Sequence, residues 1–299
     1  MAPDSDLFFD GGDPDFQAAL IGLGRRGCDC VRRLRQTDLA DAHAFLIDHD
    51  PETRQDDALP ENTHWIGNPE TVPDFSACGL LGIVIVGAEH QDKTEQLSLR
   101  LGLLKERPTL LLGIALPPLA GERNRLKPEL LRELDGVAYW PADPGLPESW
   151  ALLQAAVEDW VGAGSVSGPV EVDLADLIAI FGSARLILIA SATQERPADP
   201  ERIEAAAYAA YAALAELYER GFQPGQVTGM LIVVRGADGA SIEGYEAVRR
   251  LFRDILSDAA ILALAAPGGE GWRERTRVSL FAVGTFAALS AVAPPALSP

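Results

Sequence analysis

The chain has 299 residues, which is long enough for one large domain or two medium-sized domains with real hydrophobic cores. Hydrophobic residues make up 47% of it, as is typical of a globular protein. Its formal net charge of −19 argues against a general nucleic-acid binder, because neutralising phosphates needs clustered Lys and Arg. The same charge argues against electrostatic docking on an anionic membrane.

Neither end of the chain nor its cysteines indicate export. Residues 1–15 are acidic and lack the basic and apolar regions of a signal peptide. No run approaches the roughly 20 apolar residues of a membrane span. Cys28, Cys30 and Cys78 give no disulfide framework, and Cys28-x-Cys30 lacks the second cysteine pair of a metal site. We therefore expect a cytoplasmic protein with no membrane segment and no metal site of its own.

Residues 16–34 have the pattern of an apolar strand, a glycine turn and a helix. Gly22, Gly24 and Gly27 reproduce G-x-G-x-x-G, in which glycine lets a phosphate approach the backbone and the helix N-terminus offers free N–H donors. The alternative is a tight turn of any α/β domain, and the motif alone favours that alternative.

Strands alternate with helices through residue 161. A short strand at 44–47 ends in Asp48-His49-Asp50, where an acid contacts a ribose or simply caps a turn, two interpretations that we weigh equally. Residues 51–73 are polar and loop-like. Strands follow at 80–86, 109–116 and 137–140, and helices at 95–107, 128–134 and 147–161, the first with leucines at 97, 101 and 104 on one face. This alternation predicts a mostly parallel, doubly wound sheet.

A Gly/Ser cluster at 162–169 marks the best candidate for a domain boundary. Beyond it we expect helices at 171–181, 200–220 and 241–256. The strands expected there span 184–192, 230–234, 260–266 and 277–283.

Four features of the chain resemble the FtsZ/tubulin superfamily. IGLGRRGCDCVRRL at 21–34 is similar to the family's GVGGGGGNAVNRM, and FLIDHD at 45–50 to a strand ending in NTD. GPVEVDLADL at 168–177 is closely similar to GLMNVDFADV. GMLIVV at 229–234 and RVSLFAVG at 277–284 look like the strands GVLVNITG and RVTVVATG. The matches occur in the right order and at the right spacing.

The resemblance implies an α/β fold with a Rossmann-like, parallel-sheet, GTPase-type domain, a central helix and a smaller α+β C-terminal domain. We expect these parts at 16–146, 147–168 and 169–286, with tails at 1–15 and 287–299. In the family, subunits stack head to tail and two acids of one subunit polarise water in the nucleotide pocket of the next. Asp173 and Asp176 match these acids, and helix capping explains them equally well.

The resemblance also implies a set of nucleotide contacts, with GTP or GDP as the cofactor and Mg²⁺ only where a nucleotide is bound. Around the phosphates it places Gly22, Gly24, Arg25, Arg26, Gly27, Asp29 and Gly87. Toward the ribose and base it places Asp48, Asp50, Arg123, Arg125 and Asp159.

The family's strongest phosphate motif, GGGTGTG, is degenerate here. Residues 87–94 read GAEHQDKT, so the repeated glycines are gone and Glu89 and Asp92 are added. A carboxylate at ~4 Å from a phosphate charge, with an effective dielectric near 20, is repelled by about 4 kcal/mol before screening.

The sequence therefore predicts an FtsZ/tubulin-like cytoskeletal or membrane-remodelling protein with degraded or absent GTP binding and hydrolysis. We expect it to assemble with itself or with another FtsZ-like subunit, in a setting such as cell division, with no nucleic-acid partner and with any membrane-associated protein partner undefined. One alternative is an active GTPase with a non-standard phosphate loop that includes Lys93-Thr94. Another is a Rossmann-type NAD(P)-dependent oxidoreductase with Asp48 on the ribose.

Overall fold

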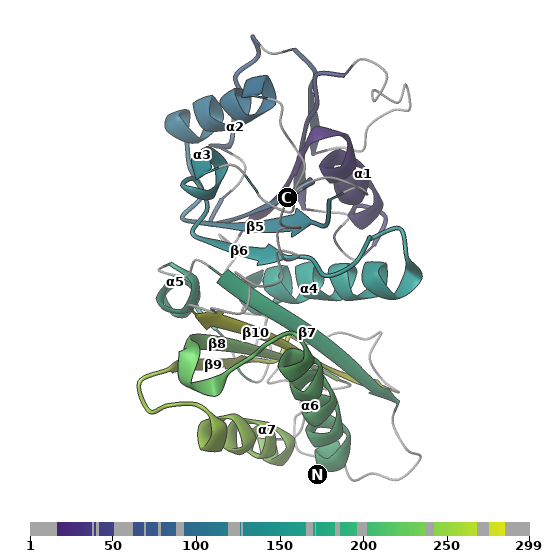
Figure 1. Cartoon of the computed structure of the whole chain (residues 1–299), viewed down its shortest axis with the longest axis vertical. Helices are drawn as coiled ribbons and strands as arrows, with labels where there is room; N and C mark the ends of the chain where they lie inside the picture. Colours follow the sequence, from purple (N-terminus) through teal and green to yellow (C-terminus); the bar gives the residue numbers. More distant parts are fainter. Residues whose placement is uncertain are drawn as a thin grey trace, which may run out of the picture.

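The computed structural model describes the chain from residue 17 to residue 284 with internal gaps. The described residues are 17–37, 39, 42–50, 62–68, 70–76, 79–87, 93–118, 126, 128–165, 170, 172–182, 186–195, 202–236, 242–267 and 275–284. Their strands form one 10-stranded sheet in the order β3-β2-β1-β4-β5-β6-β7-β10-β8-β9 (Figure 1). The predicted α/β class with a mostly parallel sheet is confirmed.

The first half of the sheet is entirely parallel. Its strands are β1 (Ala18–Leu23), β2 (His43–Ile47), β3 (Thr63–Ile66), β4 (Leu81–Gly87), β5 (Leu110–Leu116) and β6 (Gly136–Tyr139). Every residue of β1, β4 and β5 is buried, as expected for parallel strands that are covered on both faces. The helices are α1 (Gly24–Leu34), α2 (Lys93–Lys105) and α3 (Pro128–Leu131). The strand order reverses between β1 and β4, which is where ligands bind in doubly wound sheets.

The expectation of a loop over residues 51–73 is wrong in part. Thr63–Ile66 forms the edge strand β3, which pairs parallel to β2. Only Ile66 of this strand is buried, so the sequence carries little of the apolar signal that marks the central strands.

Helix α4 (Pro147–Ser165) lies between the two halves of the molecule (Figure 1). Trp150, Leu153, Val157 and Trp160 are all buried, as their common face predicted. The Trp160 ring packs edge-on against Phe181 and stacks on Phe281, with ring centroids 6.2 and 5.1 Å apart. The central helix therefore shares its core with the second half of the chain.

The second half contains three helices and the mixed end of the 10-stranded sheet, which is called the second sheet below. Its elements are α5 (Leu174–Phe181), β7 (Leu186–Glu195), α6 (Arg202–Glu219), β8 (Val227–Arg235), α7 (Ile242–Ile255), β9 (Ile261–Ala265) and β10 (Arg275–Gly284). Strand β10 pairs antiparallel with β7 and β8, and β8 pairs parallel with β9. Helices α6 and α7 cover one face of these strands (Figure 1). Between β6 and β7 the recorded register is one pair, Val137 with Leu186, so the two halves share a narrow ladder.

Helix α2 turns three of its five leucines outward, including those on the face that the sequence singled out. Leu97, Leu101 and Leu104 are exposed, and Leu104 is 81% exposed. Glu95 and Ser98 are buried because the Glu95 carboxylate accepts the His49 N–H at 2.9 Å and the Ser98 hydroxyl lies 3.4 Å from His49 Nε2. The apolar part of the buried face consists of Leu99 and Leu103.

No helix within the described ranges combines the length and the apolar character needed to cross a membrane.

Candidate functional site

The glycine turn lies at the reversal of strand order, and each glycine has a geometric reason. A Cβ on Gly22 would lie 2.7 Å from the backbone N and Cα of Cys28, and a Cβ on Gly27 would lie 2.1 Å from the Ile85 carbonyl oxygen. These two glycines let α1 pack directly on β1 and β4. Gly24 has a φ of +67°, in the left-handed region that favours glycine, and starts the helix. A tight strand-to-helix turn, the alternative to a phosphate site, therefore fully explains the three glycines.

The N-terminus of α1 also suits an anion. Leu23 occupies the N-cap and provides no side-chain cap, and the first turn contains no acid. Arg25 is exposed, and Arg26 Nη1 donates to the Pro117 carbonyl at 2.7 Å, beyond the end of β5. Uncapped N–H groups, the positive end of the helix dipole and two guanidinium groups together favour a phosphate-like group at this edge. Among the described residues, no group of three or more His, Cys, Asp or Glu side chains could hold a metal ion.

The acids that follow β2 are mostly engaged with the protein. Asp48 is buried, and its Oδ1 accepts the Asp50 N–H at 2.9 Å, so Asp48 caps its own turn. Burial raises the pKa of Cys28, and the negative charges of Asp48 and Glu95 raise it further. Two buried acids therefore lie close behind the glycine turn and oppose a highly charged anion there. Asp29, the remaining acid of the turn, is exposed and pairs with Arg32 Nη1 at 2.7 Å.

Some of the residues that we expect to contact the nucleotide lie outside the described residues. Gly87 ends β4, is buried and pairs with Leu116 of β5. Arg123 and Arg125 lie outside the described ranges, and so do Glu89 and Asp92. The placement of Glu89 and Asp92 in the phosphate loop therefore stays a prediction from the sequence.

Asp173 and Asp176 form a capping box at the start of α5. Asp173 Oδ1 accepts the Asp176 N–H at 2.8 Å, and Asp176 Oδ2 accepts the Asp173 N–H at 3.4 Å. This geometry confirms the capping interpretation, while both side chains remain exposed. Helix α5 lies well apart from α1 (Figure 1), so one subunit does not bring these acids to its own glycine turn.

Solved structures of one kind match almost the whole chain. An FtsZ dimer from M. jannaschii matches with a TM-score of 0.68 and 18% identity, covering 90% of this chain and 88% of that chain. CetZ2 from Haloferax volcanii, a GTPgS-bound protofilament, matches with a TM-score of 0.63 and 15% identity over 92% and 96%. TubZ from Bacillus thuringiensis serovar israelensis, in GDP-form protofilaments, matches at 0.59 and 13% over 90% and 84%. The chain has the FtsZ/tubulin fold. No family model and no curated protein sequence matches it.

Within this FtsZ/tubulin fold, Asp159 of the central helix is fully buried against the second sheet. Its carboxylate accepts hydrogen bonds from Arg235 Nε, from Arg277 Nε and Nη2 at 3.1 and 2.7 Å, and from the Ser279 hydroxyl. The adjacent Glu158 binds Arg277 Nη2 at 3.2 Å. This arrangement gives Asp159 a structural role and leaves it no exposed surface, so we do not include it in the proposed nucleotide site.

Two further features of the sequence belong to this network. A Cβ on Gly162 would lie 2.1 Å from Arg235 Nη2, so the glycine makes room for the guanidinium group. Arg235 and Arg277 are register partners on β8 and β10, two buried cations side by side in strands whose residues are mostly buried. A charged residue in a strand of this kind is the signal from which a buried acidic partner could have been inferred.

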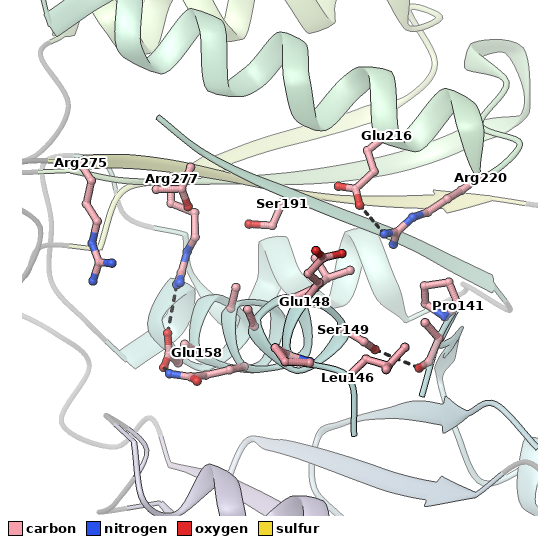
Figure 2. A pocket seen from close by; sticks show the side chains of 17 residues that line it. Pro141, Leu146, Glu148, Ser149, Glu158, Ser191, Glu216, Arg220, Arg275 and Arg277 are labelled. Atoms are coloured by element: carbon pink, nitrogen blue, oxygen red, sulfur yellow. Dashed lines mark hydrogen bonds and ion pairs between the residues drawn. The ribbon is translucent and has the colours of Figure 1, made fainter. Parts of the chain in front are cut away.

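A groove of about 930 Å³ runs between α4 and the second sheet (Figure 2). Its charged lining residues include two pairs that bind each other, Arg277 with Glu158 and Arg220 with Glu216 at 2.5 Å (Figure 2). These two pairs bridge the walls of the groove or one of its helices, and Glu148 and Arg275 are the other charged residues that line it.

Proposed function

We propose that this chain is an FtsZ/tubulin-like cytoskeletal protein that assembles head to tail and whose GTP binding and hydrolysis are degraded or absent. The observation that carries the proposal is the placement of Asp173 and Asp176, exposed at the start of α5 and apart from the glycine turn. Acids in this position reach a nucleotide only in a neighbouring subunit. The division into a nucleotide-binding-type domain, a central helix and a C-terminal domain is part of this proposal.

Assembly is supported by what the structurally similar proteins form. The matched CetZ2 and TubZ structures are protofilaments, and the matched FtsZ is a dimer. Val170 and Ile178 are exposed near the two acids and add apolar area to the face that would meet the next subunit. In a mixed filament, the neighbouring subunit would be a different FtsZ-like chain.

Weak nucleotide binding is supported by the charges around the glycine turn. The α1 N-terminus with Arg25 and Arg26 is the part that would hold a phosphate group of GTP or GDP, with Mg²⁺ arriving only with the nucleotide. The buried acids Asp48 and Glu95 would disfavour a phosphate group there by charge repulsion.

The test combines GTP calorimetry, GTP turnover and sedimentation of the purified full chain with two variants of one residue. Asp173→Asn keeps an N-cap acceptor and removes the negative charge, whereas Asp173→Ala removes both. We expect slow or absent turnover in the wild type and concentration-dependent oligomers in wild type and Asp173→Asn alike. Robust turnover that Asp173→Asn abolishes without loss of stability would refute the degraded-enzyme proposal, and a monomer at every concentration would refute assembly.

An active GTPase with a non-standard phosphate loop is the second candidate. The uncapped N-terminus of α1 favours it. Nucleotide that co-purifies with the chain, seen by its ultraviolet absorbance and identified by chromatography, would support it. The oxidoreductase alternative needs Asp48 on a ribose, and Asp48 is buried and caps its own turn, so we expect no NAD binding.

The cellular setting completes the proposal. Cys28 and Cys30 are both free thiols, which fits a reducing cytoplasm. A role in cell division or membrane remodelling would require a membrane-associated protein partner. Co-sedimentation with vesicles of anionic and neutral lipids in the absence of other proteins is expected to fail.

A further inference from the structure

The outer face of α6 carries three exposed tyrosines. Tyr208, Tyr211 and Tyr218 are 61%, 57% and 47% exposed. The opposite face of the helix packs on the second sheet through buried residues that include Ala206, Ala210 and Leu217. Helix α6 lies on the outside of that sheet (Figure 1), so the tyrosine face points away from the rest of the described molecule.

The exposed face forms a regular seam. Tyr208, Tyr211, Ala215 and Tyr218 follow each other at intervals of three, four and three residues, and Ala215 is exposed as well. This is the spacing with which one helix presents a continuous stripe to another. Residues 205–215 contain no charged side chain at all, in a chain whose formal net charge is −19.

The seam is symmetric about residue 213. If two copies of α6 cross antiparallel at that residue, Tyr208 faces Tyr218 of the second copy, and Tyr211 faces Ala215. A large side chain then lies over a small one on both sides of the axis, as in knobs-into-holes packing. A two-fold contact requires a patch that is complementary to itself, and this seam meets that requirement. We propose that the tyrosine face of α6 binds the same face of a second copy of this chain across a two-fold axis.

Charge supports a second copy as the occupant. Two chains that each carry −19 repel one another, so a contact between them is favoured where the surface has little charge. The centre of the seam lies in the uncharged stretch 205–215, and Glu216 and Glu219 flank Tyr218 at its end. Tyrosine adds large apolar area and ordered side chains at such a contact. The other exposed apolar stripe, on α2, is bordered by charged groups, among them the ion pairs Arg100–Glu133 and Lys105–Asp74, which a contact there would have to desolvate.

The two-fold contact does not require head-to-tail assembly, but it would affect how head-to-tail filaments associate with each other. In head-to-tail filaments, a two-fold contact whose axis is perpendicular to the filament pairs filaments that run in opposite directions. The seam is only about 15 Å long, so single subunits pair weakly, and the pairing strengthens when many contacts repeat along a filament. Helix α5 and the glycine turn take no part in it.

The first experiment is sedimentation equilibrium of the nucleotide-free full chain over a wide concentration range. Tyr211→Glu places two negative charges at the centre of the seam and should raise the dimer dissociation constant about tenfold or more. Leu104→Glu adds the same charge to an exposed apolar residue of α2 and should leave the constant unchanged. Circular dichroism verifies that both variants fold. A monomeric wild type, equal effects of the two substitutions, or a larger effect of Leu104→Glu would each overturn the proposal.

The second experiment tests the register with disulfide formation in a Cys78→Ser background. Tyr211→Cys chains mixed with Ala215→Cys chains should cross-link about fivefold faster than either chain alone, because only the mixed pair lies directly opposite. Equal rates in the three samples, or no cross-link, would overturn the two-fold register. If cross-linking fails while head-to-tail oligomers persist, this inference alone fails; if cross-linked dimers form without longer oligomers, the proposed function alone fails.

Discussion

Replacing Asp159 with alanine tests whether the central helix is fastened to the second sheet by charge. The substitution removes a fully buried carboxylate that accepts bonds from Arg235, Arg277 and Ser279. It leaves two buried guanidinium groups side by side on β8 and β10, with the Glu158 carboxylate and backbone oxygen as the remaining acceptors shown for them.

The expected loss is about 3–5 kcal/mol, the usual cost of removing one partner from a buried ion pair. That is a large part of the roughly 5–15 kcal/mol by which native proteins are stable. Asp159→Asn keeps the shape and loses the charge, so it should also be destabilising, by a smaller amount. The control is Glu246→Ala, which breaks an exposed ion pair with Arg249 and should cost about 1 kcal/mol or less.

Chemical denaturation monitored by tryptophan fluorescence measures these differences, because Trp160 packs against Phe181 and Phe281 beside the network. The reasoning would be refuted if Asp159→Ala were as stable as the control. If that variant also lost binding of a guanine nucleotide that the wild type holds, Asp159 would be the base-reading acid that the family resemblance implied.

Three further outcomes follow from the geometry. Gly27→Ala should lower the free energy of unfolding by about 3 kcal/mol, because the added Cβ would meet the Ile85 carbonyl oxygen. Gly24→Ala should lower it by about 1 kcal/mol, because Gly24 has a left-handed φ. Thermal melts that rank the two variants the other way would contradict the packing argument. Leu99→Ala, in the core, should cost about 3 kcal/mol and Leu104→Ala less than about 0.5 kcal/mol in denaturant titrations. Equal losses would contradict the orientation of α2, and a larger loss for Leu104→Ala would show that the helix faces the other way. Burial raises the pKa of Cys30 from 9.0 to about 12, so the unfolded chain loses this proton first and stability should fall as pH rises from 9 to 12. The fall is at most about 1.4 kcal/mol per pH unit, and the wild type should lose more over this window than Cys30→Ala in denaturation at each pH.

The sequence predicted the central strands and most helices because their signals are local. Strands β4 and β5 are unbroken apolar runs, and Asp173 with Asp176 reads directly as a helix start. Strand β3 was missed because a short, half-exposed edge strand needs almost no apolar residues.

The orientation of α2 could not be read from its leucines. Periodicity shows which residues share a face and does not show which face meets the core. The outcome was decided by Glu95 and Ser98, whose bonding to His49 holds the polar start of the helix inward. His49 lies 46 residues before Glu95, and no local pattern connects the two.

The partners of Asp159 could not be inferred from the family resemblance. The resemblance placed Asp159 near a base, while its partners Arg235 and Arg277 lie 76 and 118 residues away in the sequence. Only the fold brings β8 and β10 under the central helix.

The Asp159 network also bears on the orientation of the two halves that head-to-tail assembly would need. The recorded ladder between β6 and β7 is a single register pair, which leaves the angle between the halves weakly set by the sheet. The buried charges fasten α4 to β8 and β10, and α4 shares one buried hydrophobic core with strands of both halves. The proposed head-to-tail contact needs α5 at one end of the subunit and the glycine turn at the other, each at a set orientation. If the nucleotide site is degraded as proposed, this orientation can persist, because the buried residues that hold it lie in the body of the protein.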